Sequence, residues 1–145
     1  MNIEAILATK GREVKTVRPG TTVAEVARRM RQERIGAFVV SEDDKRILGI
    51  ISDRGIMHAI TDRGVSVMEQ PIETIMAREV VTCRPNEPVG AIMGLMTERR
   101  IRHIPVVDGD GRMCGIISIG DVVKHRLDEV QREAEAMREY ISGVI

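Results

Sequence analysis

The sequence predicts an α/β fold in which one β-α-β-β-α unit occurs twice in tandem. Residues 13–52 align without a gap with residues 79–118, and both segments end in GIIS. Each segment also contains stretches of strand period and of helical period in the same order. A repeat of this length indicates a duplicated structural unit. We therefore expect two similar halves, followed by a long C-terminal helix.

Each copy is expected to begin with a short strand, at residues 14–17 in the first copy and 80–83 in the second. A helix follows, because apolar residues recur at intervals of three and four positions and so share one face. That face predicts packing against the strands. Its residues are Val23, Val26, Ala27 and Met30 in the first copy and Val89, Ile92, Met93 and Met96 in the second.

Two apolar runs come after this helix, at residues 37–40 and 46–51 of the first copy, with a polar turn between them. The pattern predicts a buried hairpin, and the second copy repeats it. The next helix is expected to begin at Ser52 or Ser118, since a serine hydroxyl can cap a helix N-terminus. Pro71 can start a short helix in the linker between the copies.

A longer helix is expected from about Asp121 to Tyr140. Its apolar residues alternate intervals of four and three, which is a heptad seam that could pair with a second chain or pack back on its own domain. Both readings stay open. The chain divides into repeat 1 with an N-terminal helix (1–66), linker and repeat 2 (67–125) and the C-terminal helix (126–145), a candidate dimer contact. The seam contains Val123, Leu127, Val130, Ala134, Met137 and Ile141.

The composition argues against nucleic acid and membrane as partners. The chain carries 22 basic and 22 acidic residues, so it lacks a general attraction for polyanions. Phe38 and Tyr140 are its only aromatic residues, too few for a base-stacking surface. No apolar run approaches the ~18 residues of a membrane span, and the N-terminus does not resemble a signal peptide. We expect a cytoplasmic protein.

The duplicated unit, together with RHIPVVDGDGRMCGIISIGDVV (102–123), resembles a tandem pair of CBS domains of the stand-alone bacterial type. The motifs that carry the resemblance are PVVD (105–108), before the hairpin turn, and G-I-I-S-x-x-D (115–121), after it. The resemblance implies that the two repeats are related by a pseudo-twofold axis and form a disc that often dimerises. It also implies adenosine-containing ligands in the clefts between the repeats: AMP first, with ADP, ATP, NAD or S-adenosylmethionine as alternatives, and no metal.

Ser118 and Asp121 are the candidate ribose-binding residues. They occupy the first turn of a helix that follows a strand, where free N–H groups and the helix dipole favour polar ligands. A carboxylate can accept hydrogen bonds from both hydroxyls of a ribose. The alternative is structural, because acidic residues are favoured in a first helical turn whether or not anything binds.

Arg102 and His103 are the candidate phosphate-binding residues, since an arginine can hold phosphate oxygens bidentately and a histidine can add a donor. By the resemblance, residues at this position contact the phosphates; the alternative is an exposed basic strand start. The resemblance also places the adenine over Ile116 and against the first copy. The matching first-copy positions are Lys10, Arg12, Lys15, Ile35 and Gly36.

The mirror-related site of the first copy is expected to be weaker. Gly55 stands where the second copy has Asp121, so the ribose carboxylate is missing there. We predict one cleft that binds a nucleotide well and one that is weak, empty or adapted to another ligand. The residues of this second site are Ile50, Ser52, Arg54, Val81 and Ile101.

The sequence therefore predicts a non-catalytic sensor of an adenine nucleotide, working as a homodimer that reports to an unidentified effector protein. One alternative is a structural dimerisation module whose ligand sites are vestigial. Another is a small nucleotide-converting enzyme, but the sequence shows no nucleophile, metal cluster or base for one. His58 and His125 are expected at the surface, without a metal-binding partner.

Overall fold

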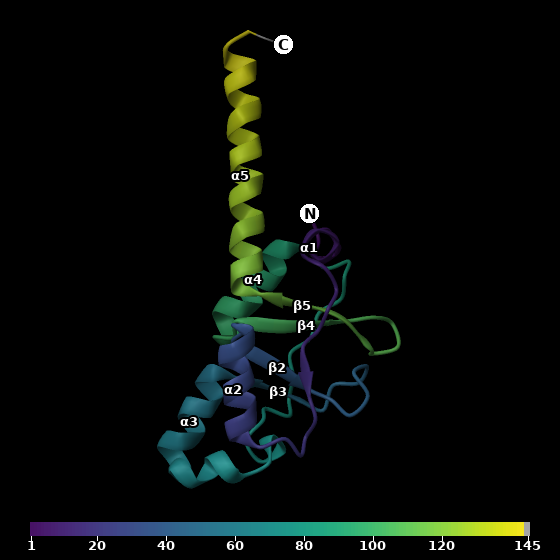
Figure 1. The fold of residues 1–145 in the computed structure, drawn as a ribbon. Helices are drawn as coiled ribbons and strands as arrows, with labels where there is room; N and C mark the ends of the chain where they lie inside the picture. The colour runs from purple at the N-terminus through teal and green to yellow at the C-terminus, as the bar shows by residue number, and fades with distance from the viewer. Residues whose placement is uncertain (144–145) are drawn as a thin grey trace.

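Each repeat folds around its own antiparallel hairpin, as predicted. The computed structural model describes residues 1–143 (Figure 1). In the first repeat β2 pairs with β3 and β1 runs parallel to β2, whereas β4 and β5 form the hairpin of the second. The elements are α1 (Ile3–Lys10), β1 (Thr16–Val17), α2 (Val23–Glu33), β2 (Ala37–Val40), β3 (Gly49–Ser52), α3 (Asp53–Arg63), η1 (Val65–Glu69), η2 (Ile72–Thr74), α4 (Val89–Arg99), β4 (His103–Val107), β5 (Met113–Ser118) and α5 (Ile119–Ile141).

The strand predicted at residues 80–83 is reduced to a single bridge between Cys83 and Val106, and this part of the prediction is wrong. In the first repeat the Val39 N–H donates to the Lys15 carbonyl at 3.2 Å, next to the short strand β1. The mirror-related residue of Val39 is Pro105, which has no N–H to donate. The corresponding hydrogen bond to Val81 therefore cannot form, and the second repeat lacks a third strand.

Side-chain caps define where several helices begin. The Thr22 hydroxyl accepts from the Glu25 N–H at 3.2 Å, and the Ser52 hydroxyl accepts from the Gly55 N–H at 3.1 Å. Ser118 opens α5 with a reciprocal capping box: its hydroxyl accepts from the Asp121 N–H, and the Asp121 carboxylate accepts from the Ser118 N–H. These contacts satisfy N–H groups that a helix start leaves without backbone partners.

The segment that precedes each repeat completes the hydrophobic core of the other one. Helix α1 precedes the first repeat, yet Leu7 is buried in the core of the second and lies over Gly115. Met76, in the linker before the second repeat, is buried in the core of the first and lies over Gly49. The two halves are therefore interlocked, and neither core is complete without a segment from the other side of the chain.

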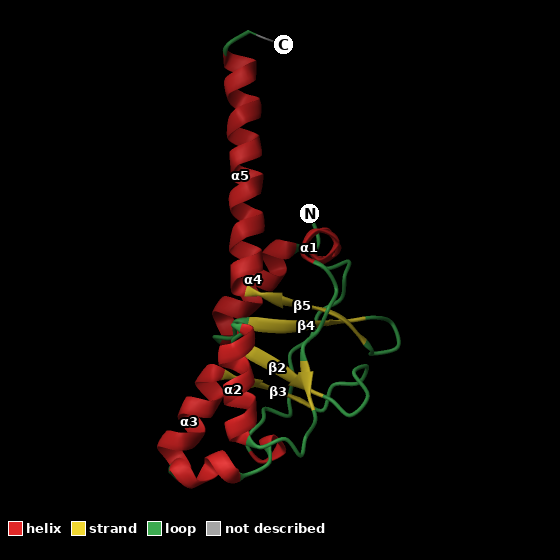
Figure 2. Ribbon diagram, viewed as in Figure 1, coloured by secondary structure: helices red, strands yellow, loops and turns green. Residues whose placement is uncertain are grey.

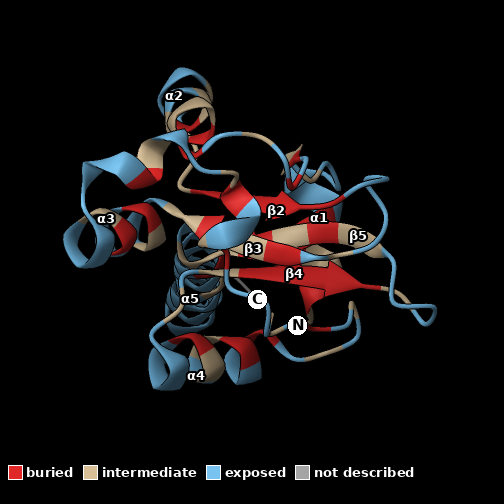
Figure 3. Cartoon of the chain, turned by 90° about the horizontal axis from the view of Figure 1, so that it is seen from below, coloured by how far each residue is buried: buried red, intermediate tan, exposed pale blue. Residues whose placement is uncertain are grey.

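The two hairpins lie one above the other, with α2, α3 and α4 at one end of the strands and the hairpin turns at the other (Figure 2). Polar contacts tie the two turns together: the Met113 N–H donates to the Lys45 carbonyl and the Arg46 guanidinium donates to the Asp110 carbonyl, both at 2.8 Å. The strands are largely buried, as are the inner faces of the helices that cover them (Figure 3).

Helix α5 extends far beyond the rest of the molecule (Figure 1). Val122 is its one residue classed as buried within the described chain, whereas Leu127 and Val130 of the predicted seam are exposed. The last two positions assigned to this helix by the sequence, 144 and 145, lie outside the described residues. Within residues 1–143 no helix is both long enough and apolar enough to cross a membrane.

Alanine at Gly49 or Gly115 should destabilise the protein. A Cβ atom at Gly115 would lie 2.5 Å from Leu7 Cδ2, and one at Gly49 would lie 2.5 Å from Met76 Sδ and 2.8 Å from the Ala77 carbonyl oxygen. Overpacking of this kind costs about 1–3 kcal/mol. Urea unfolding should show a lower free energy of unfolding for both variants, with the larger loss at Gly49, where the backbone itself is in the way.

Gly94→Ala is the matched control. Gly94 lies inside α4 and a Cβ there meets no atom within 4 Å, so alanine should stabilise the helix by about 0.5–1 kcal/mol. Unchanged unfolding of Gly49→Ala and Gly115→Ala would contradict the interlocked packing.

Candidate functional site

Two clefts lie between the repeats at mirror-related positions. The first has a volume of about 390 Å³ and the second of about 330 Å³. Ala37 and His103, which are equivalent residues of the two copies, line both clefts. The two clefts therefore adjoin each other at this pair, near the pseudo-twofold axis.

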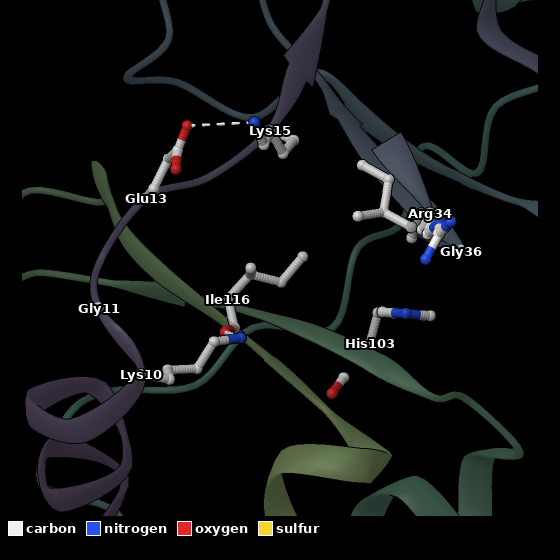
Figure 4. Close-up of a pocket in the computed structure, with 11 residues that line it drawn as sticks. Lys10, Gly11, Glu13, Lys15, Arg34, Gly36, His103 and Ile116 are labelled. Carbon is white, nitrogen blue, oxygen red and sulfur yellow. Dashed lines mark hydrogen bonds and ion pairs between the residues drawn. The ribbon is translucent and has the colours of Figure 1, made fainter. Parts of the chain in front are cut away.

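The first cleft brings together most of the residues predicted to bind the nucleotide (Figure 4). Of the lining residues outside that set, Arg34 and Ala37 directly flank predicted positions, and Gly11 and Glu13 lie in the segment between Lys10 and Lys15. Ion pairs from Lys15 to Glu13 and Glu33, each 3.3 Å, hold its ammonium group at this wall. The predicted residues that line the cleft are Lys10, Lys15, Ile35, Gly36, His103, Ile116 and Ser118.

The backbone of Ile116 forms an open edge in the first cleft. Ile116 lies opposite Pro105 in the β4–β5 ladder, and the Pro105 carbonyl turns away from β5 to accept from the Cys83 N–H. In such a pair both residues direct their backbone groups outward. The Ile116 carbonyl accepts from Lys10 Nζ at 2.9 Å. Within residues 1–143 the Ile116 N–H has no partner outside the ladder.

The carboxylate of Asp121 lies beside the first cleft rather than in its lining. One oxygen, Oδ2, accepts both from Lys10 Nζ at 2.6 Å and from the Ser118 N–H at 2.8 Å. Burial alone would raise the pKa of Asp121, but these two hydrogen bonds outweigh it and hold the pKa below its ordinary value. Asp121 is therefore ionised at neutral pH, and it links α1, β5 and the start of α5.

Two further predicted residues do not line the first cleft. The Arg12 guanidinium pairs with Glu4 of α1, with Nη1 at 3.1 Å from Oε2, so its side chain folds back onto α1 instead of into the cleft. Arg102 lines the second cleft instead, and its Nη2 donates to Asp53 Oδ1 at 3.0 Å. This ion pair crosses from one repeat to the other. The strand position of Arg102 is as predicted, but its side chain belongs to the neighbouring cleft.

His103 is half-buried between the two clefts, and its imidazole lies against Gly36. Burial lowers the pKa of His103, and the adjacent charge of Arg102 lowers it further. The carboxylates of Asp53 and Asp121 act in the opposite direction, and Lys10 adds a smaller lowering. The net result is an imidazole that is neutral at neutral pH and so carries a single N–H donor.

The second cleft contains four of the five residues predicted for it: Ile50, Ser52, Arg54 and Ile101. Val81 is not among its lining residues. The edge that is open at Ile116 is closed here, because the Ile50 N–H donates to the Ala77 carbonyl at 3.0 Å and the Ala77 N–H donates back at 2.9 Å. His58 and Arg100 also line this cleft. The sequence could have indicated these two residues, because their mirror-related residues, Lys124 and Arg34, are also basic.

Comparison with known proteins identifies the same duplicated unit. A model of the CBS domain matches the chain twice, at residues 6–62 and 72–128. A CBS-domain-containing protein from Agrobacterium tumefaciens is 39% identical, with a TM-score of 0.83 over 87% of this chain and 99% of that one. The CBS domain-containing protein YhcV of Bacillus subtilis is 30% identical over 125 residues, which is 86% of this chain and 87% of its own length.

A CBS domain protein from Pyrobaculum aerophilum, solved in complex with AMP, has the same fold. It is 27% identical, with a TM-score of 0.72 over 83% of this chain and 89% of that one.

The low pKa of His103 predicts a pH dependence of stability. Below about pH 6.5, the ordinary pKa of histidine, the unfolded chain takes up this proton more readily than the folded protein. The free energy of unfolding should therefore fall as the pH falls from about 7.5 to about 5.5. In His103→Gln this fall should be smaller, as measured by urea unfolding across the range. Identical pH profiles of the two proteins would contradict the buried, neutral state of His103.

Proposed function

The chain belongs to the CBS domain family, and we propose that it is a non-catalytic regulatory module that binds an adenine nucleotide, AMP first, in the cleft lined by Lys10, Ile35, Ile116 and Ser118. The observation that carries this proposal is the open backbone edge at Ile116 beside an ionised carboxylate, Asp121. The AMP complex of the Pyrobaculum relative supports the same ligand class.

The adenine lies between aliphatic side chains and is read by the backbone. Ile35 and Ile116 come from different repeats and line the same cleft, so they can cover the two faces of a purine. The free N–H of Ile116 supplies a donor for a ring nitrogen. Because the chain has few aromatic residues, this apolar contact takes the place of stacking.

The ribose is held at the start of α5. Asp121 Oδ2 is already used by Lys10 and Ser118, whereas Oδ1 has no hydrogen bond to any of residues 1–143. A ribose hydroxyl can donate to Oδ1, and displacement of Lys10 frees Oδ2 for the second hydroxyl. Hydrogen bonds to a charged group contribute about 1.5–3 kcal/mol each, so this carboxylate dominates the affinity.

The phosphate lies toward His103, at the boundary of the two clefts. An anion here favours protonation of the imidazole, so a nucleotide should bind with uptake of a proton and more tightly as the pH falls. Lys15 is a second cation in the lining. Arg102 is held by Asp53 and faces the other cleft, so it contributes less to this phosphate than the sequence suggested.

The module acts by linkage: a ligand that bridges both repeats favours one arrangement of the repeats or subunits over another. We expect it to work as a homodimer that reports to an effector protein. Its cytoplasmic location stays a prediction from the sequence. A structural dimerisation module with vestigial sites is the alternative function, and the exposed seam of α5 is the observation that favours it.

Thermal unfolding with and without AMP tests the proposal. AMP at a hundred times its dissociation constant should add about 2.7 kcal/mol to the free energy of unfolding. At the same AMP concentration Asp121→Ala should lose at least about half of this increment, and calorimetry should show at least about a tenfold weaker affinity, because the ribose acceptor is gone. ADP, ATP, NAD and S-adenosylmethionine measured in parallel rank the ligands.

Thr22→Ala is the matched control, because Asp121 also caps α5 and its removal lowers stability without ligand. Thr22 caps α2 and lines neither cleft, so this variant should lose stability but keep the full AMP increment. If Asp121→Ala binds AMP as tightly as the wild type, or if no adenosine compound binds, the structural alternative becomes the better account.

A further inference from the structure

We infer that the second cleft binds a polyphosphate group rather than a nucleoside. The inference rests on the proposed function in treating both clefts as ligand sites, but it assigns the second cleft a different ligand class. The lining of this cleft contains Arg54, Arg100 and Arg102 together with two imidazoles, and none of its lining residues is acidic.

The two halves of the chain differ in charge at mirror-related positions. At three mirror-related pairs of positions, the first cleft has an aspartate and two glycines, whereas the second has a glycine and two arginines. At these three positions the exchange removes one negative charge and adds two positive ones. The second cleft in turn lacks Lys10 and Lys15 of the first, so three lysines or arginines line each cleft, and the acidic residue Glu13 lines only the first. The pairs, each 66 positions apart, are Asp121 and Gly55, Gly36 and Arg102, and Gly120 and Arg54.

The cations come from both sides of the cleft. Arg54 and His58 are four residues apart in α3 and therefore share a face of that helix near its positive end. Arg100 follows α4 in a left-handed conformation (φ 54°), and Arg102 lies just before β4. Guanidinium groups on opposite walls match a chain of phosphates, because each can hold two oxygens of one phosphate.

Two features disfavour a nucleoside in the second cleft. Gly55 leaves the ribose without a carboxylate acceptor, and the backbone edge of Ile50 is closed by Ala77. An adenosine would therefore find neither the acceptor nor the free N–H that the first cleft offers. A triphosphate group needs neither, whether it is free or part of a nucleotide whose base lies outside the cleft.

Asp53 is the one carboxylate that competes with such a ligand. It pairs with Arg102 at 3.0 Å, and both side chains are about half exposed, so the pair can open toward solvent. A terminal phosphate that replaces Asp53 brings up to a second formal charge to the same guanidinium. Removal of Asp53 should therefore strengthen the binding of polyphosphate, whereas removal of an arginine should weaken it.

Isothermal titration calorimetry with inorganic tripolyphosphate, which has no nucleoside, tests this inference on the full chain. We expect binding that weakens with salt, at least about a tenfold loss of affinity in Arg54→Gln and in Arg100→Gln, and a gain in Asp53→Asn. Arg34→Gln is the matched control: Arg34 is the mirror-related residue of Arg100 and lines the first cleft, so tripolyphosphate affinity should persist.

The outcomes separate this inference from the proposed function. Absence of tripolyphosphate binding while AMP binds would overturn the inference and leave the proposed function standing. A loss in Arg34→Gln but not in Arg100→Gln would place the anion in the first cleft and also overturn it. Binding of tripolyphosphate with the expected variant pattern supports it even if AMP fails to bind, as does binding of ATP that follows the same pattern.

From a different observation, we propose that α5 pairs with α5 of a second copy as a parallel coiled coil. The seam residues Val123, Leu127, Val130, Met137 and Ile141 have side chains that are 45–75% exposed. Val122, which belongs to the core of the second repeat, and His125, whose side chain is 12% exposed, lie about 100° and about 160° around the helix from the seam. The seam therefore points away from the body, and two bodies can lie on the outside of the pair.

Charges beside the seam select the parallel orientation. Glu133 and Arg138 flank the apolar layers and are five positions apart, so in a parallel in-register dimer each Glu133 meets Arg138 of the second copy. Both side chains are exposed, and neither has an ion-pair partner within residues 1–143. An antiparallel pairing of the same layers would place Glu133 opposite Glu133 and Lys124 opposite Arg138, which is repulsive.

Sedimentation equilibrium of a matched pair of variants tests this surface. Ala134 lies in the seam and Ala136 lies off it, and both are exposed. Ala134→Glu should weaken dimerisation at least about tenfold, because it places a charge between the helices, whereas Ala136→Glu should not. A monomeric wild type, or equal dimerisation of both variants, would overturn the proposal.

Disulfide formation in Ile141→Cys tests the orientation. In a parallel in-register pair the two introduced thiols face each other and should crosslink on oxidation, and peptide mass spectrometry should find the 141–141 linkage. In an antiparallel pair they lie at opposite ends, so a dimer that fails to crosslink would overturn the parallel arrangement.

Discussion

The docking of each leading segment on a glycine of the opposite repeat is the contact on which the rest of the structure depends. Leu7 over Gly115 and Met76 over Gly49 complete the two cores, and only a residue without a side chain allows either approach. The residues that follow each of these segments, 10–15 after α1 and Ala77 after Met76, then form one wall of a cleft. The shape of the clefts therefore depends on the packing of the core, and substitutions in the core will also change the clefts.

The duplicated unit, the hairpins, the helix caps and the long final helix could all be predicted, because each depends on local periodicity or on a single capping residue. The exchange of the segments that precede each repeat could not be predicted. Nothing in IEAILA (residues 3–8, in α1) indicates which of two similar cores it packs into. The packing of a leucine side chain over the glycine in β5 has no signal in the local sequence either. The missing strand in the second repeat follows from one proline opposite it.

Most of the residues that line the first cleft were predicted, because the resemblance to CBS domains implies which positions of the two copies face each other. The exceptions are long charged side chains. Arg12 and Arg102 each turn to a carboxylate, Glu4 and Asp53, that the sequence does not place near them. Asp121 is used three ways at once, in the helix cap, in the ion pair with Lys10 and at the edge of the cleft. A ligand that draws on this carboxylate would therefore also act on the first turn of the projecting helix.

The position of His103 between the two clefts has a consequence for how two bound ligands would affect each other. A neutral imidazole offers one N–H, and here it lies where two separate compartments meet. Anions that arrive from either side must compete for that single donor unless the ring also takes up a proton. Two occupants would then antagonise each other near neutral pH and tolerate each other in acid. If both clefts bind anions as proposed, the protein would respond to the ratio of its two ligands rather than to the amount of one.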